Sequence, residues 1–374
     1  MKKIIVATDS FKGSLSAPEA CQIIARQAEK VFPQTEILQL PVSDGGEGLV
    51  EVVFKALGGE HKTVHTSDPL GREISASYLQ LADGSALIEI AGAGGLTLLD
   101  PGEYDPLRAS TFGVGLMILN AVKNGLDPIY IGLGGSATVD GGTGAATALG
   151  MHFLDEMGEK VISGGGLRKV QRLDLSGLRE LNYSGKLIFL TDVNNPLCGP
   201  NGAAEVFGPQ KCVTAEQVWQ LDQGLRNFAE LLERETGLNL QNVPGMGAAG
   251  GFALPFVALM GAEIRSGIDF VLDLLKFDEY LDGADLLITG EGRTDAQSAM
   301  GKAISALTRR ARAAGVRVAV ISGALGEGAE KILELGVDDL IQATPAGQSL
   351  QEALAHAAEN LANAASNYLT GLIN

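Results

Sequence analysis

The segment KIIVATDSFKGSLSAPEA, residues 3–20, combines an apolar run, a polar loop and the start of a helix. The β-branched run 3–7 is typical of a buried strand. Ser16 and Glu19 have the spacing of a capping box, so we expect a helix that continues to about Lys30. A strand that leads into a helix through a polar loop indicates a parallel α/β sheet.

The same alternation of strands and helices returns near the C-terminus. Further strands, one early and three late, are expected at residues 36–40, 285–289, 316–322 and 338–344. Helices are expected at residues 297–314 and 328–335, and another begins at the capping box of Ser349 and Glu352. Because alternating strands and helices form parallel crossovers, residues 1–60 and 270–374 are expected to form a discontinuous flavodoxin-like domain with a parallel sheet.

The middle of the chain, residues 61–269, is expected to form an inserted second α/β domain. A chain of 374 residues exceeds the usual size of a single core, so two domains are expected. The inserted domain begins with strands bounded by turn residues, which should be antiparallel, at residues 62–66, 74–81 and 86–90. Helices and strands then alternate at residues 108–124, 128–132, 141–150, 186–191 and 215–235.

Composition narrows the class of protein. Hydrophobic residues make up 45% and charged residues 20%, which is typical of a globular protein. The formal charge of −17 argues against nucleic acid and anionic membranes as partners. Three cysteines and four scattered histidines show neither metal-ligand spacing nor a disulfide framework, which favours the cytoplasm. We expect a monomer or homodimer that acts on small molecules.

Polar, glycine-rich segments follow five of the expected strands. They are DSFKGS (9–14), SDGGEG (43–48), GLGGSATVDGG (132–142), TDVNNPLCGPNG (191–202) and GEGRTD (290–295). Ligands of open α/β sheets bind beyond the carboxyl ends of the strands, so these segments are candidates for the site. A cleft between the two domains is its expected place.

The segment GLGGSATVDGG suits an anion cradle. Gly134, Gly135 and Ser136 could present backbone N–H groups, and a helix over residues 141–150 could add its positive end. Asp140 would repel a phosphate there unless a divalent cation lay between them. Tight packing of the helix on the sheet is the alternative explanation for the glycines.

Two other function classes remain open at this point. Gly132, Gly134 and Ala137 match a dinucleotide fingerprint after a strand, as in a nicotinamide-dependent hydroxy-acid dehydrogenase. However, the loop continues to Gly142, whereas the helix of that motif should begin within the fingerprint. A non-catalytic protein that binds small anions is the other alternative.

Charged side chains gather in the same segments. The acids that follow expected strands are Asp9, Asp44, Glu47, Asp192, Glu291 and Asp295. Each alone suits a helix cap, but phosphoryl transfer needs one carboxylate for Mg²⁺ and another as the base. The cations within or beside glycine-rich segments are Lys12, Lys211, Arg293 and Lys302, which could bind a carboxylate or phosphoryl oxygens.

These segments closely resemble the bacterial glycerate kinase family, whose two domains are a flavodoxin-like sheet and an inserted α/β domain. The matching strings include DSFKGSLSA (9–17), PVSDGGEG (41–48), GLGGSATVDGG (132–142), TDVNNPLCGPNGAA (191–204), VFGPQK (206–211), GAAGG (247–251) and GEGRTDAQSAMGK (290–302). The resemblance implies transfer of the ATP γ-phosphoryl group to glycerate, with Mg²⁺. The product in similar enzymes is usually 2-phosphoglycerate, although the family name has also covered the 3-phospho product.

The resemblance and the residue types together suggest roles. Asp192 is the expected general base on the glycerate hydroxyl, and Asp44 or Asp295 the expected metal ligand. The catalytic cations are expected to be Lys12, Arg293 and Lys302. Residues expected to line the substrate site are Asp9, Ser10, Asn194, Lys211 and Gln297. The nucleotide phosphates are expected at Gly134, Gly135, Ser136, Ala137 and Thr138.

Overall fold

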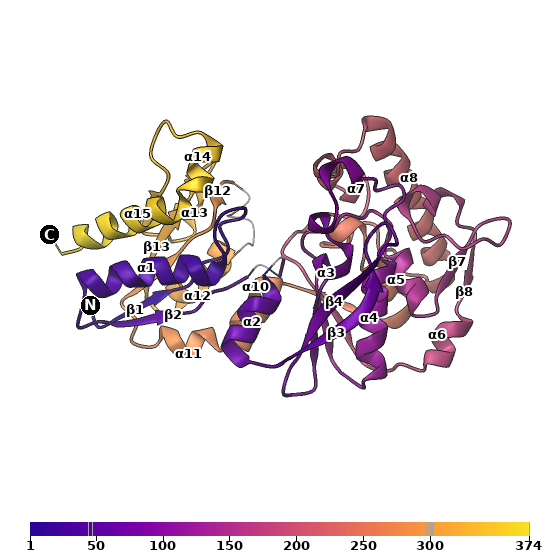
Figure 1. Cartoon of the computed structure of the whole chain (residues 1–374), viewed down its shortest axis with the longest axis horizontal. Coiled ribbons are helices and arrows are strands. Elements are labelled where there is room, and N and C mark those ends of the chain that lie inside the picture. Colours follow the sequence, from indigo (N-terminus) through magenta and orange to yellow (C-terminus); the bar gives the residue numbers. More distant parts are fainter. Residues whose placement is uncertain (44, 47, 297, 299–302, 374) are drawn as a thin grey trace. The chain divides into compact units, whose positions relative to one another are not determined.

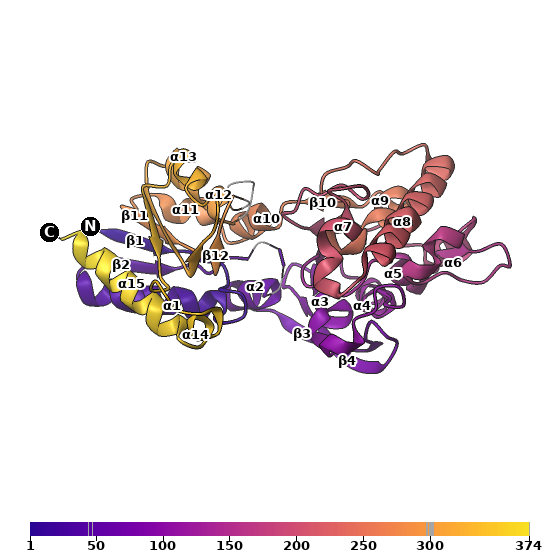
Figure 2. The same cartoon turned by 90° about the horizontal axis from the view of Figure 1, so that it is seen from above.

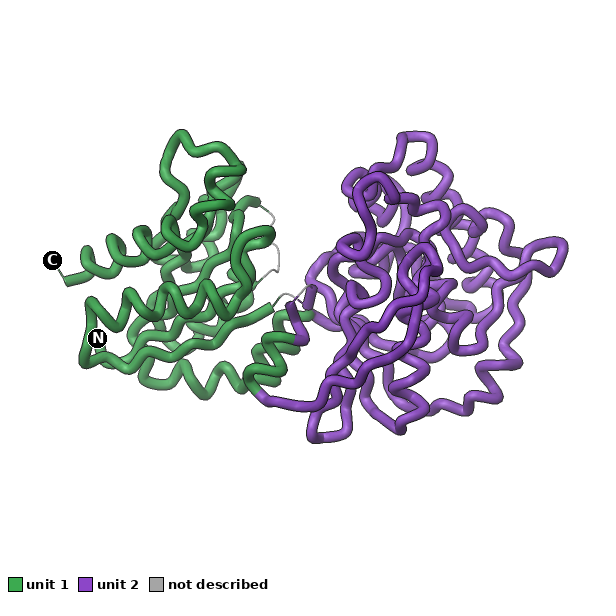
Figure 3. Tube along the Cα trace, viewed as in Figure 1, with its two compact units in different colours: residues 1–44, 51–56, 267–374 green, residues 45–50, 57–266 purple. Residues whose placement is uncertain are grey.

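A computed structural model of the chain describes residues 1–43, 45–46, 48–296, 298 and 303–373. Figure 1 labels its helices and strands. The chain forms two compact units, coloured separately in Figure 3. Unit 1 comprises residues 1–44, 51–56 and 267–374, and unit 2 comprises residues 45–50 and 57–266.

Unit 1 contains a five-stranded parallel sheet. Its strands are β1 (Lys3–Val6), β2 (Glu36–Gln39), β11 (Leu286–Thr289), β13 (Arg317–Ser322) and β15 (Asp339–Gln342). They lie in the order β2-β1-β11-β13-β15, and every neighbouring pair is parallel. This is the flavodoxin-like order, so the predicted fold class is confirmed. Each strand agrees with its expected range within two residues at either end.

Helices cover both faces of this sheet. Figure 2 shows α1 (Ala17–Val31) beside α15 (Ala357–Gly371) on one face, with α11 (Phe277–Leu281), α12 (Ala303–Ala313) and α13 (Lys331–Glu334) on the other. Ile4 and Ile288 pack beneath α1 and α15 in the core. The capping box of Ser16 starts α1 as expected. In place of one final helix, the chain forms two, α14 (Leu350–Ala355) and α15, which are separated at His356.

Unit 2 contains a mixed six-stranded sheet. Its strands are β3 (Glu60–Ser67), β4 (Glu73–Gln80), β5 (Ala86–Glu89), β6 (Ile129–Gly132), β9 (Leu187–Leu190) and β10 (Glu263–Arg265). β3, β4 and β5 are antiparallel, as expected, and β5, β6, β9 and β10 are parallel in that order. The three-residue strand β10 was not expected, nor was the small ribbon of β7 (His152–Leu154) and β8 (Arg172–Asp174).

The helices of unit 2 pack around one large apolar core. They include α3 (Ala91–Gly94), α4 (Phe112–Lys123), α5 (Thr143–Ala148), α6 (Ser176–Leu181), α7 (Ala203–Phe207), α8 (Ala215–Thr236) and α9 (Leu254–Met260). Phe189 of β9 contacts Phe252 and Phe256, which anchors the start of α9 on the sheet. α4 begins four residues later than expected, and α5 is shorter than the expected 141–150.

The sequence analysis did not predict α2 (Leu49–Leu57) and α10 (Gly267–Leu274), nor the short helices α3, α6, α7, α9 and α11. Among the described residues, no helix has the length and apolar character needed to cross a membrane.

Candidate active site

The carboxyl ends of four strands of unit 1 border a cavity of about 300 Å³. Its lining comes from the segments that follow β1, β11, β13 and β15, together with α14 and α15. Asp9, Ser10, Lys12 and Arg293, four of the expected site residues, all line it. In a flavodoxin-like sheet the ligand binds where the strand order reverses, which here is between β1 and β11.

The segment after β1 has a fixed shape. Asp9 is only 5% exposed, and its carboxylate accepts a hydrogen bond of 2.6 Å from the Ser10 N–H. The Phe11 N–H donates to Leu15 O, and Gly13 adopts a φ of +81°, which closes the turn. This turn leaves the side chain of Lys12 exposed beside the cavity.

The segment after β11 is tied by hydroxyl groups. Glu291 accepts hydrogen bonds from Thr294 Oγ1 at 3.1 Å and from Ser298 Oγ at 2.5 Å. The Asp295 N–H donates to Ser298 Oγ. Arg293 stays largely exposed, with its Nε 3.8 Å from the Asp295 carboxylate. Ser298 was not among the expected residues. The signal that could have indicated it is its spacing, because it lies three residues after Asp295, as the second residue of a capping box does.

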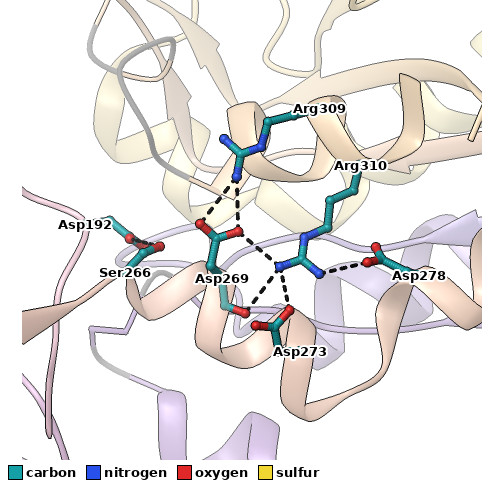
Figure 4. Close-up of polar contacts among 7 residues, drawn as sticks. All are labelled: Asp192, Ser266, Asp269, Asp273, Asp278, Arg309 and Arg310. Atoms are coloured by element: carbon teal, nitrogen blue, oxygen red, sulfur yellow. Dashed lines mark hydrogen bonds and ion pairs between the residues drawn. The ribbon is translucent and has the colours of Figure 1, made fainter. Parts of the chain in front are cut away.

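A second group of polar side chains follows the parallel strands of unit 2. Asp192 comes after β9 and Ser266 directly after β10, and Ser266 Oγ donates to Asp192 Oδ1 at 2.7 Å (Figure 4). Asn194 lies exposed in the same segment as Asp192. The sequence analysis missed Ser266, because the strand before it is only three residues long.

Most of the expected phosphate cradle is buried. Gly134 is half-buried and Gly135 is exposed, but Ser136, Ala137 and Thr138 are 5%, 2% and 0% exposed. The Ala137 N–H donates to Gly94 O, and the Thr138 N–H donates to Ser136 Oγ. The last three residues are therefore buried and bonded within the loop, and the nucleotide-binding role expected for them stays a prediction.

Asp140 is structural. Its fully buried carboxylate accepts hydrogen bonds from the Thr111 N–H (2.8 Å), Thr111 Oγ1 (2.7 Å), the Gly142 N–H (3.1 Å) and the Gly144 N–H (3.2 Å). Burial raises the pKa of Asp140, and these four donors oppose that rise. Asp140 accepts from the N–H groups of Gly142, the N-cap of α5, and of Gly144 in its first turn, so these two groups are not available to a phosphate, contrary to expectation.

Lys211, expected at the substrate site, is also buried. Its side chain is 1% exposed, and Nζ donates to Thr138 O at 2.7 Å. Burial lowers the pKa of Lys211 to about 7, partly offset by the charge of Asp140. Lys211 therefore binds the backbone of the glycine loop from within the protein, and the substrate-binding role expected for it stays a prediction.

The fit of these residues to Mg²⁺ follows from their chemistry. The described residues contain no group of three or more His, Cys, Asp or Glu that could hold a metal ion. Mg²⁺ commonly needs only one or two carboxylates together with substrate phosphates, so Asp295 suits it. Asp44, the other expected ligand, lies outside the described residues, as do Gln297 and Lys302.

A cluster of charges near the start of α10 serves packing. Arg310, whose side chain is 15% exposed, binds Asp269 at 3.1 Å, Asp273 at 2.7 Å and Asp278 at 3.2 Å (Figure 4). Arg309 adds a second contact to Asp269. These ion pairs join α12 to α10 and α11 within unit 1.

Comparison with known proteins identifies the family. The family model described as "Glycerate kinase family" matches residues 4–372. A glycerate kinase of Halalkalibacterium halodurans is 40% identical over 98% of this chain and 97% of its own length, and a glycerate 2-kinase of Escherichia coli is 38% identical over 98% and 96%. The crystal structure of a putative glycerate kinase 2 from Salmonella typhimurium matches with a TM-score of 0.82 and 37% identity, covering 100% of this chain and 98% of that one. These relatives lend no support to a dehydrogenase, and the chain belongs to the glycerate kinase family.

Proposed function

We propose that the protein is a glycerate kinase, which transfers the γ-phosphoryl group of ATP to a hydroxyl group of glycerate. The observation that carries this proposal is the family match across residues 4–372. Phosphoryl transfer depends on positioning and charge neutralisation more than on a covalent nucleophile. The acids and cations that follow the parallel strands suit that chemistry.

Asp192 is the proposed general base. The hydroxyl of Ser266, 2.7 Å away, donates a hydrogen bond that orients the Asp192 carboxylate. The glycerate hydroxyl gives its proton to Asp192 as its oxygen bonds to the γ-phosphorus. The bond from that phosphorus to the bridging oxygen breaks, and ADP leaves with the electron pair.

The cations have a complementary role. Lys12 and Arg293 line the unit 1 cavity beside Asp9 and Ser10, and we assign them to oxygen atoms of the transferred phosphoryl group. Lys302 and Gln297 are expected to add further contacts. Asp295 and Asp44 would hold Mg²⁺, which when bound neutralises charge on the phosphates.

The unit 2 segments are assigned to the smaller anion. Gly134 and Gly135 expose backbone near the end of β6, and Asn194 is exposed after β9. These groups can bind the carboxylate of glycerate without a cation of their own. We propose 2-phosphoglycerate as the product and the cytoplasm, where ATP is available, as the location. Light scattering would distinguish a monomer from a homodimer.

Replacement of the base tests the mechanism. Asp192→Asn is expected to lower kcat by about 10²–10⁴ with little change in ADP affinity, the usual scale for loss of a general base. Ser266→Ala keeps the base but removes the donor that orients it, so kcat should fall less than in Asp192→Asn. Asp174→Asn is a matched control, because this carboxylate also ends a strand and binds a serine, at Ser176 N.

The assay measures ADP release across a panel of small hydroxy acids. Coupling to enolase without a mutase detects 2-phosphoglycerate alone and so tests the regiochemistry. Near-normal turnover in Asp192→Asn would remove Asp192 from the proposed role. Absence of ADP release with glycerate would overturn the proposed function itself.

A further inference from the structure

The unit 1 cavity has two chemically different ends. Asp9, Lys12 and Arg293 lie at the end near β1 and β11. The other end, beside β15, is lined by Leu350 and Ala353 of α14 and by other small or apolar side chains. A polar end and an apolar end in one cavity suit a ligand that is itself divided in this way.

The apolar end contains leucine side chains that are exposed to solvent and not buried in the core. Leu350 is 77% exposed and Leu354 is 39% exposed, although both line the cavity. A Cβ atom at Gly13 would lie 3.8 Å from Leu354 Cδ2, so this leucine borders the polar turn after β1. Leu354 therefore connects the two ends, and the exposed leucines form an apolar wall for a ligand rather than part of the core.

The size of the cavity bears on which substrate fits. Its volume of about 300 Å³ lies at the lower limit of sites for cofactors and drug-sized molecules. A three-carbon hydroxy acid is polar throughout, so it has no group to place against Leu350 and Leu354. ATP has an apolar flat base at one end and a polyanion at the other.

We propose that the apolar end of this cavity binds the adenine base and ribose of ATP, with the triphosphate directed toward Lys12 and Arg293. This inference rests on the proposed kinase function and assigns its nucleoside subsite. It places the nucleotide on unit 1, whereas the glycine loop of residues 132–142 belongs to unit 2.

A buried amide completes the subsite. Asn360 of α15 is 6% exposed and lines the cavity, and its Nδ2 donates to Gln348 Oε1 at 2.9 Å. With its amino group engaged in this way, the amide presents Oδ1 as an acceptor. An amide oxygen at this end can accept a hydrogen bond from the exocyclic amino group of adenine.

The test fills the apolar end and measures nucleotide binding directly. Ala357→Phe enlarges a half-buried side chain that lines the cavity, whereas Ala358→Phe makes the same change at the exposed neighbouring position. Calorimetric titration with ADP should show at least a ten-fold higher Kd for Ala357→Phe and a change of less than two-fold for Ala358→Phe. The KM for ATP should rise in parallel, and the KM for glycerate should stay within two-fold.

Leu350→Gln provides a second variant that cannot disturb the core, because Leu350 is largely exposed. It should weaken ADP binding about three-fold. If Ala357→Phe does not fold, the Kd for ADP of Leu350→Gln alone tests the subsite. Unchanged ADP affinity in the folded variants, or a rise in the glycerate KM alone, would overturn the subsite. A wild-type protein that binds ADP through this subsite but does not phosphorylate glycerate would refute only the proposed function.

Discussion

Replacement of Asp140 by asparagine tests the structural role of the buried carboxylate. Oδ2 accepts three hydrogen bonds, two from Thr111 and one from Gly144, and Oδ1 accepts one from Gly142. Asparagine has one acceptor oxygen. If that oxygen takes the position of Oδ2, its amino group faces the Gly142 N–H, and two donors oppose each other in a site without solvent.

The magnitude follows from these contacts. Loss of a hydrogen bond to a charged acceptor costs about 1.5–3 kcal/mol, and a buried donor without a partner costs about 1–3 kcal/mol. We therefore expect Asp140→Asn to lower the free energy of unfolding of unit 2 by roughly 3–5 kcal/mol. For a domain of this size, that corresponds to a fall in Tm of roughly 6–20 °C.

Urea unfolding followed by tryptophan fluorescence measures this change. Trp219, the one tryptophan in the sequence, lies on α8 and so reports on unit 2. Asp155→Asn is the control, because Asp155 also accepts two backbone bonds, from Met157 and Glu159, but at an exposed site where water can replace them. A loss below about 1 kcal/mol in Asp140→Asn, similar to the control, would show that the four-donor argument is wrong.

Three further changes probe buried contacts, two of them in unit 2 and one in unit 1. Burial lowers the pKa of Lys211 from 10.5 to about 7. Between pH 7 and pH 10.5, Lys211 is therefore protonated in the unfolded chain but largely neutral in the folded protein. Stability should therefore rise with pH by roughly 1 kcal/mol per unit above pH 7, and denaturation of Lys211→Met at pH 7, 8 and 9 should lack this rise. Gly250→Ala places a Cβ 2.3 Å from Thr138 O, so thermal unfolding should show a loss of about 2–5 kcal/mol in the free energy of unfolding. Gly237→Ala is the control, because φ is also positive there but the space is open, and it should cost about 1 kcal/mol. Arg310→Met should destabilise unit 1 by about 1–3 kcal/mol, and calorimetry in about 1 M NaCl should show a smaller loss.

The fold could be predicted largely from local patterns. β-branched runs and capping boxes gave the five strands of unit 1 and the start of α1, because these signals depend on neighbouring residues. β10 was missed because three residues are too few to show a period. The division between α14 and α15 was also missed, since one capping box predicts where a helix begins but not where it ends.

The site could be predicted only in part. The glycine-rich segments marked the ends of the strands, and four expected residues do line one cavity. Burial could not be predicted, because it depends on segments far apart in the chain. Thr138 is buried beneath Lys211, which lies 73 positions away, and Ala137 is fixed by the backbone of Gly94. The apolar wall of α14 was also missed, because Leu350 and Leu354 look like ordinary core positions of an amphipathic helix.

The two explanations for the glycines of residues 132–142 apply to different parts of that segment. A Cβ at Gly142 would lie 2.1 Å from Phe252 O, and one at Gly132 would lie 2.7 Å from Gly45 O, so these glycines allow close packing of backbone. Gly135, in contrast, would meet only a side-chain carbon, Ala91 Cβ, at 3.4 Å, and it is exposed. We therefore propose an anion-binding role for Gly134 and Gly135, the two residues of this loop that are not buried.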